Sequence, residues 1–133
     1  MYGRGGLVYV YFVYGMHWQF NISTAGEGKP EAVLIRAVVP VIEVRPAGWK
    51  LDKATWPRTN GPAKLCKYLG IDRELYGEDL AGSRKVWLED RGVVLPPRSM
   101  RRGPRIGINY AGPVWAAKPW RFWLESSRFP EPK

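Results

Sequence analysis

Two polar residues stand within apolar stretches of the sequence, and both have side chains suited to binding chemistry. Arg36 is the only charge in the run over residues 32–39, and Asn21 belongs to the alternating stretch over residues 17–23. A buried charge is costly unless a partner compensates it. We therefore expect Arg36 to have a functional partner, to form a structural ion pair, or to lie at an edge. Asn21 predicts either an amide that reads a ligand or an ordinary strand residue that faces solvent.

Aromatic residues are the second candidate set, with seven Trp, seven Tyr and four Phe in 133 residues. Such rings fill cores, and they also offer flat faces to nucleic-acid bases. Tyr9 and Tyr11 share one face of a strand because side chains alternate with a period of two. Tyr14 falls at the following turn, where an aromatic tip can enter a DNA groove or can simply be a core or surface tyrosine.

The net charge of +9 is concentrated near the C-terminal end of the sequence. Residues 91–133 hold nine basic residues against Glu125 and Glu131, which gives a net charge of +7 there. A clustered positive field attracts phosphate backbones, although it can also be a solvated surface. Lys64 follows a predicted helix start, where it could bind phosphate or remain a solvated helix lysine.

Several classes of site and location are not expected. Cys66 is the only cysteine and His17 the only histidine, so neither an internal disulfide nor a zinc site is predicted. Cys66 is interpreted as buried packing rather than as a nucleophile. The apolar run over residues 7–14 is shorter than the ~20 residues of a membrane span, and no small-residue cleavage site follows it. We expect no membrane association and a reducing compartment.

The elements that would position these residues are mostly strands. Residues 7–14 and 17–23 predict a hairpin around Tyr14, Gly15 and Met16, and residues 32–39 predict a third strand. Residues 40–59 are expected to be irregular. A helix should begin at residues 60–62, with Asn60 as its capping residue, and should end at Gly70.

The remaining segments complete a predicted α+β fold with few helices. Residues 85–89, 105–108 and 120–123 are expected to be strands, and residues 96–104 a basic loop. We expect a single domain over residues 1–133. Because residues 7–14 form so strong a strand, they should lie at a sheet edge or pair with a segment further upstream.

Several motifs together resemble the alkyladenine (3-methyladenine) DNA glycosylase family. They occur in the family's order and cover most of the chain: YVYFVYGMH at residues 9–17, Asn21, AVLIRA at residues 32–37, NGPAKLC at residues 60–66, RIGINYAG at residues 105–112 and KPWRF at residues 118–122. No single motif is specific, whereas the combination is. The resemblance implies a curved, mostly antiparallel β-sheet with a DNA-inserting β-hairpin.

This resemblance implies roles for the hairpin residues. Tyr14 would be the intercalating wedge, flanked by Met16 and His17. Tyr11 would form a wall of the base pocket, and Asn21 would exclude the exocyclic amine of normal guanine. A glycosylase needs these parts because it must take its target base out of the duplex and hold it in a pocket.

The resemblance also implies how the reaction would proceed. Arg36 and the backbone carbonyl of Ile106 would hold the attacking water, and Lys64 would contact the DNA backbone. The family's general base is a glutamate in a Glu-Ala-Tyr-type segment upstream of the hairpin, together with a stacking Tyr and a pocket His. None of the eight glutamates of this sequence falls in that motif. We therefore expect the N-terminal catalytic segment to be absent and the sequence to be the C-terminal two-thirds of the domain.

The implied function is a monofunctional N-glycosylase of base excision repair. It would remove 3-methyladenine, 7-methylguanine or hypoxanthine from double-stranded DNA with water as the nucleophile. It would act as a monomer without a cofactor or metal, in the bacterial cytoplasm or a eukaryotic nucleus. Two alternatives stay open. The chain could be a non-catalytic DNA-binding remnant of the family, or an unrelated RNA-binding β module that should prefer single strands.

Overall fold

The computed structural model describes residues 1–44, 48–52 and 54–125. The chain divides into two compact units, unit 1 over Met1–Asp90 and unit 2 over Arg91–Lys133. Each unit is described by itself below. The described strands are antiparallel throughout and accompanied by few, short helices, which confirms the predicted α+β class. They form three separate sheets rather than one, whereas the curvature of the sheet and the single domain stay predictions.

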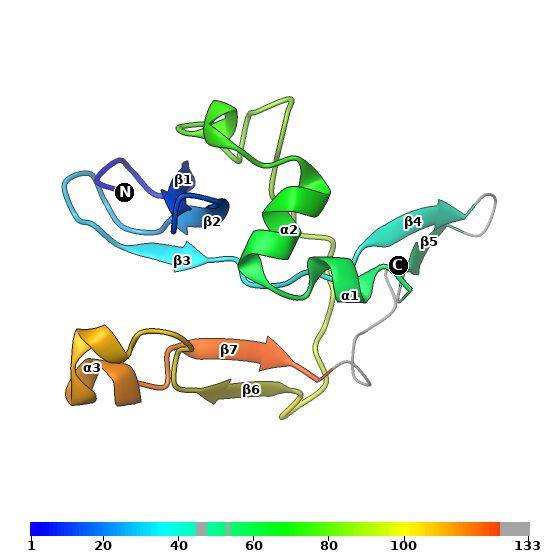
Figure 1. Ribbon diagram of the computed structural model, residues 1–133. Helices are drawn as coiled ribbons and strands as arrows, with labels where there is room; N and C mark the ends of the chain where they lie inside the picture. Colours follow the sequence, from blue (N-terminus) through cyan, green and yellow to red (C-terminus); the bar gives the residue numbers. More distant parts are fainter. Residues whose placement is uncertain (45–47, 53, 126–133) are drawn as a thin grey trace. The chain divides into compact units, whose positions relative to one another are not determined.

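Unit 1 is built on a three-stranded sheet with the order β1-β2-β3 (Figure 1). Strands β1 (Val8–Val13) and β2 (His17–Ser23) form the predicted hairpin, from the Val8–Ile22 pair to the Val13–His17 pair. Strand β3 (Ala32–Leu34) is shorter than the predicted residues 32–39. Ala37 instead bridges to Asn60, and the Thr59 hydroxyl donates to the Val38 carbonyl at 2.7 Å.

Residues 40–59 are more regular than the sequence suggested. Strands β4 (Val41–Val44) and β5 (Gly48–Leu51) pair as a second hairpin, and helix α1 (Trp56–Thr59) follows. The prediction of an irregular segment was wrong because glycine and proline were interpreted only as breakers. Gly48 begins a strand, and α1 has its proline in the first turn, where a missing N–H costs no helical hydrogen bond. The predicted break at Pro46 lies outside the described residues.

Helix α2 (Pro62–Leu69) matches its predicted bounds, and Gly70 ends it in the left-handed conformation at φ 65°. The N-cap, however, is Gly61 rather than Asn60, and no side chain caps the helix. The N-cap position requires a φ of 140°, which residues with a side chain rarely adopt. Glycine adopts it freely, so Gly61 is the N-cap instead of the expected Asn60.

The core of unit 1 lies between α2 and one face of the β1-β2 hairpin. Its fully buried apolar members come from both elements and from the segments that follow α2: Val8, Val10, Phe20, Leu65, Cys66, Ile71 and Leu80. Burial raises the pKa of the Cys66 thiol, which a backbone hydrogen bond to Phe20 only partly opposes. This agrees with the interpretation of Cys66 as packing, because a buried neutral thiol is a poor nucleophile.

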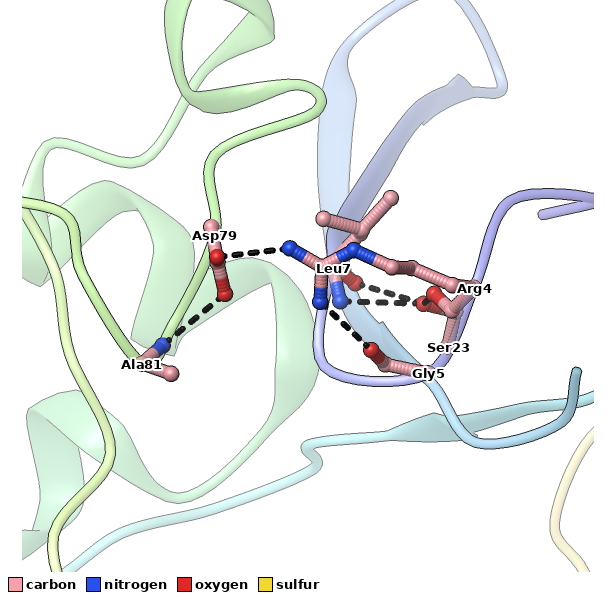
Figure 2. A network of polar contacts seen from close by, with 6 residues as sticks. All are labelled: Arg4, Gly5, Leu7, Ser23, Asp79 and Ala81. Carbon is pink, nitrogen blue, oxygen red and sulfur yellow. Dashed lines mark hydrogen bonds and ion pairs between the residues drawn. The ribbon is translucent and has the colours of Figure 1, made fainter. Parts of the chain in front are cut away.

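Strand β1 is an edge strand of this sheet. Its free edge is partly covered by residues 77–80, which follow the 3₁₀ helix η1 (Arg73–Leu75). The Val8 N–H donates to the Glu78 carbonyl at 2.8 Å, and the Gly77 N–H donates to the Val8 carbonyl at 2.9 Å. Figure 2 shows the polar contacts that fix this junction. The Arg4 guanidinium pairs with Asp79 at 2.7 Å, and the Ser23 hydroxyl accepts from the Leu7 N–H at 3.0 Å.

The predicted strand over residues 85–89 does not form. The Ser83 hydroxyl accepts from the backbone N–H groups of Lys85 at 3.1 Å and Val86 at 3.4 Å, so these groups close a turn instead of a ladder. Trp87 and Leu88 are exposed. The β-forming pattern was misleading because no described strand lies beside it to pair with.

Unit 2 contains a two-stranded ribbon of β6 (Met100–Gly103) and β7 (Arg121–Leu124). Strand β7 confirms the prediction over residues 120–123 to within one residue. Strand β6 lies where a basic loop was expected. The predicted strand over residues 105–108 is a bend instead, because Gly107 takes a φ of 74° just before the 3₁₀ helix η2 (Asn109–Ala111). Helix α3 (Pro113–Ala117) follows η2.

Candidate nucleic-acid interface

The tip of the β1-β2 hairpin is a tight turn that presents one large side chain. The Met16 N–H donates to the Val13 carbonyl at 3.1 Å, and both central residues have positive φ, 54° at Tyr14 and 65° at Gly15. This is the backbone of the type I′ turns that suit the twist of hairpins. Glycine adopts it freely, but for a tyrosine it costs about 1–2 kcal/mol. Tyr14 is nevertheless 84% exposed, so packing of its ring does not explain the strain.

The residues beside the tip are exposed as well. Met16 is 65% exposed, and His17 is exposed at the start of β2, opposite Val13. The structure therefore places Tyr14, Met16 and His17 together at one protruding end, as the sequence predicted. Exposed side chains of this size at the tip do not contribute to the core and are available for contact with a partner.

The hairpin has two chemically different faces. One face carries Val8 and Val10, which are buried in the core, and nearer the tip Phe12, which is exposed and contacts the Trp18 ring. Because side chains alternate, Tyr9 and Tyr11 occupy the other face, where their cross-strand partners are Asn21 and Gln19 respectively. The Tyr9 and Tyr11 rings lie 5.5 Å apart between centroids and are tilted by 34°. The second face is thus lined with aromatic and amide groups rather than aliphatic ones.

Asn21 is almost fully buried in that face, with 6% of its surface exposed. Its Nδ2 donates to the carbonyls of Tyr9 at 3.2 Å and Gln19 at 3.3 Å. The alternative of a strand residue facing solvent is therefore wrong. The two hydrogen bonds fix the orientation of the amide, and no described residue donates to its Oδ1. The Asn21 Oδ1 is therefore an acceptor held in one orientation near Tyr9 and Tyr11. Such an acceptor can distinguish bound bases by whether their edges carry a hydrogen-bond donor.

One aromatic residue on this face was not predicted. Tyr76, just after η1, meets the Tyr9 ring edge to face with 5.9 Å between centroids. Sequence reasoning missed it because residues 77–80 pair with β1 across a long loop, and nothing local indicates that pairing. The available signal was the glycine that follows Tyr76, because glycine favours turns. In the structure Gly77 indeed has a positive φ of 85°.

Arg36 lies just beyond β3, in a segment without regular structure, and is half-buried. It was expected within a strand and in need of a partner. Across the described residues, no hydrogen bond or ion pair joins its guanidinium to another group. Its proposed part in holding a water therefore stays a prediction, as does that of Ile106, which belongs to unit 2 and is 54% exposed.

Lys64 is exposed in the first turn of α2. Its Nζ lies 3.5 Å from the Pro57 carbonyl, which is too long for a strong hydrogen bond. The ammonium group is therefore free to approach a phosphate, and its contact with the DNA backbone stays a prediction.

Two further classes of site are not seen in the described part of the chain. No group of three or more His, Cys, Asp or Glu side chains lies there in positions that could hold a metal ion. None of the helices described is long and apolar enough to cross a membrane.

Comparison with known proteins identifies related sequences. A profile described as methylpurine-DNA glycosylase (MPG) matches residues 1–128. The chain is 43% identical over 129 residues to a protein of Myxococcus xanthus, covering 96% of this chain and 60% of the relative. It is 41% identical over 138 residues to a protein of Desulfitobacterium hafniense, covering 97% and 66%. Both relatives are named "Putative 3-methyladenine DNA glycosylase". The chain spans somewhat less than two-thirds of the length of either.

Proposed function

The chain belongs to the methylpurine-DNA glycosylase family, and from this we propose that it is part of a DNA N-glycosylase. The protein would flip a damaged purine out of duplex DNA and hydrolyse its bond to deoxyribose. The proposed substrates are 3-methyladenine, 7-methylguanine and hypoxanthine. Hypoxanthine and 3-methyladenine pair less well than normal purines, so flipping can select them, whereas the positive charge of 3-methyladenine and 7-methylguanine makes each base a better leaving group.

The observation that carries this proposal is Tyr14. A base that leaves the stack creates a gap, which must be filled to keep the duplex open. Tyr14 projects from the hairpin tip with 84% of its surface exposed and in a strained backbone conformation. Strained residues that packing does not explain tend to lie at functional sites. We assign Tyr14 as the wedge, with Met16 and His17 beside it against the groove.

The second face of the hairpin supplies a matching pocket wall. Tyr11 would stack on the flipped base, while Asn21 would read its edge. Guanine differs from hypoxanthine by an exocyclic amine, so a rigidly held Asn21 would disfavour guanine by crowding that group. 7-Methylguanine keeps the amine, so its selection would rest on its positive charge rather than on Asn21. The two hydrogen bonds from Asn21 to the hairpin backbone support this role, because they prevent the amide from turning away.

Hydrolysis also needs a water that is positioned and deprotonated. Arg36 and the Ile106 carbonyl would position it, but a guanidinium cannot accept a proton at neutral pH. In the family that the motifs resemble, the general base is a glutamate of a Glu-Ala-Tyr-type segment. These 133 residues do not contain that segment. Arg36 also has no carboxylate partner among the described residues. This favours a second possibility for residues 1–133 taken alone, namely lesion binding without hydrolysis.

Substitution of the wedge tests the proposal. Tyr14→Ala should weaken binding to a lesion-containing duplex by about tenfold or more, which is ~1.4 kcal/mol, and should affect single-stranded DNA much less. Only the duplex has a gap to fill. Tyr110→Ala is the matched control, because Tyr110 is similarly exposed at 86% but lies away from the hairpin in sequence, in η2. Equal losses on both DNA forms would show that Tyr14 is structural.

A further inference from the structure

Two cations and two tryptophans of unit 2 form one connected cluster, which we call the Arg105–Lys118 cluster. The Arg105 guanidinium carbon lies 5.1 Å from the centre of the Trp120 ring, and the Trp120 and Trp115 rings lie 5.7 Å apart. The Lys118 Nζ lies 5.9 Å from the Trp115 ring. The Arg105 Nη2 also donates to the Trp115 carbonyl at 3.3 Å. Both cations are thus held against aromatic faces.

Local structure explains how the cluster forms. Gly112, at φ 82°, leads from η2 into α3, and Pro113 begins that helix. Helix α3 carries Trp115 and is followed by its C-cap residue Lys118, to whose carbonyl the Trp120 N–H donates at 2.8 Å. This tight return brings Trp120 beside Trp115. The cations are therefore positioned by a short, closed segment rather than by flexible side chains alone.

The positive charge of the cluster is not compensated within the described residues. Glu125, the only carboxylate between residues 91 and 125, pairs with Arg101 at 3.0 Å. Neither Arg105 nor Lys118 forms an ion pair there, and the Nε of Arg105 is buried without a hydrogen-bond partner. Trp115 and Trp120 keep 53% and 51% of their surfaces exposed. An exposed aromatic surface with two uncompensated cations is complementary to an anion that also has apolar parts.

We propose that the Arg105–Lys118 cluster binds the phosphodiester backbone of duplex DNA. The inference rests on the proposed function and adds a second contact region to the hairpin. With its Nε buried and its Nη2 bonded to the Trp115 carbonyl, the Arg105 guanidinium can offer a phosphate its remaining N–H groups, and the Lys118 ammonium adds a point charge for a neighbouring phosphate. The exposed ring edges can pack on deoxyribose. Such a contact would orient the protein on DNA without reading the sequence.

The test is a salt titration of the affinity of the 133-residue chain for undamaged duplex DNA. Each phosphate contact contributes about 0.9 to the slope of log K against log salt concentration. The double variant Arg105→Gln/Lys118→Gln should therefore lower the magnitude of the slope by about 1.8. A slope that stays at the wild-type value would overturn the proposal.

Two further variants separate the cluster from the general field and from a loss of folding. Arg98→Gln/Arg102→Gln removes the same charge from unit 2 at exposed side chains that form no cation–π contact with a described ring, and should lower the slope by less than half as much. An equal fall would mean that only net charge matters, and would also overturn the proposal. Arg105→Lys/Lys118→Arg keeps both charges and should retain the slope. If this variant lost both the slope and the far-ultraviolet circular dichroism spectrum of the folded protein, the cluster would be needed for folding rather than for DNA binding, and the proposal would be overturned.

The outcome is independent of the test of the proposed function. Undamaged duplex has no lesion to flip, so the slope reports only backbone contacts. If the slope falls as expected while Tyr14→Ala leaves lesion preference unchanged, the cluster stands and the wedge does not. If lesion preference depends on Tyr14 but the slope of the double variant is unaltered, the reverse holds.

Discussion

The Tyr9 ring meets the Tyr76 ring edge to face, with centroids 5.9 Å apart and planes at 69°. The contact joins β1 to the segment after η1 on the hairpin face that carries Tyr11. Since Tyr9 also packs on Tyr11, Tyr76 supports the proposed pocket wall from behind, without belonging to the hairpin.

We therefore expect Tyr76→Ala to destabilise the protein by about 0.5–1.5 kcal/mol, the range for an aromatic pair. Tyr76→Phe should be neutral, because the contact uses only the ring. Urea unfolding measures both values. Tyr2→Ala is a suitable control, because Tyr2 is 64% exposed and has no ring contact with a described residue. Equal stability of the Tyr76→Ala variant and wild type would show that the ring contact contributes nothing.

A second prediction separates strain from function at the hairpin tip. Tyr14→Gly should be more stable than Tyr14→Ala by about 1 kcal/mol, because only glycine adopts a φ of 54° without a Cβ penalty. Both variants lack the ring, so both should lose lesion preference to the same extent. Thermal unfolding and duplex binding are the two measurements. If Tyr14→Ala were as stable as Tyr14→Gly, the positive φ would carry no strain.

Acid should weaken the junction between Arg4 and Asp79. The backbone N–H of Ala81 and then the Arg4 guanidinium lower the pKa of the Asp79 carboxyl. A depressed pKa means that the carboxylate stabilises the folded state above the unfolded pKa, and that this contribution is lost as pH falls through the folded value. The melting temperature of wild type should therefore fall below about pH 4 more steeply than that of Asp79→Asn.

Glu78 acts in the same direction, because the Ser83 hydroxyl and Lys85 lower the pKa of its carboxyl. The Asp79→Asn variant should therefore keep part of the acid sensitivity, and a double variant with Glu78→Gln should keep less. Glu27→Gln, at an exposed turn position, serves as a control for the loss of one acidic residue. If the melting temperatures of wild type and Asp79→Asn fell in parallel from pH 7 to pH 2, the assignment of acid sensitivity to Asp79 would be contradicted.

A further prediction concerns catalysis. General-base assistance is worth roughly 10²–10⁴-fold. Residues 1–133 alone should release hypoxanthine from a duplex slower, by about this factor, than the same chain fused at its N-terminus to a segment with the family's Glu-Ala-Tyr motif. Single-turnover base release by both polypeptides measures the ratio. Rapid release by the 133 residues alone would mean that one of their own carboxylates is the base.

In the fused polypeptide, Arg36→Gln should lower the rate of base release while leaving lesion affinity nearly unchanged. This pattern is expected of a group that positions the water rather than the base. A loss of affinity with an unchanged rate would instead place Arg36 in binding.

The sequence predicted best what local pairing determines. The hairpin was predicted correctly because its two strands are adjacent and both alternate toward a turn containing Gly15. Helix α2 was predicted because Pro62 and Gly70 mark its ends. The exposure of Tyr14 follows from the same turn. These features depend on contacts within a few residues, so a short window of sequence carries the necessary information.

Features that depend on distant partners were missed. Residues 85–89 have a strand pattern, but Ser83 engages their first N–H groups, and none of the strands that the structure describes pairs with them. The segment containing Tyr76 pairs with β1 although it has no strand pattern at all. Arg105, Lys118 and Trp120 belong to two of the motifs that carried the family resemblance, but their stacking was not predicted, because it depends on the return of the chain after α3.

The pairing of Arg4 with Asp79 has a consequence for the order of folding. These residues lie 75 positions apart, so joining them closes a long loop and carries a large entropic cost. The β1-β2 hairpin needs only neighbouring residues and can form within microseconds. We expect Tyr14 to be presented at its turn before residues 77–80 dock along β1. The tip would then be built by an early, local event in unit 1, and the support that Tyr76 gives to the pocket wall by one of the slowest.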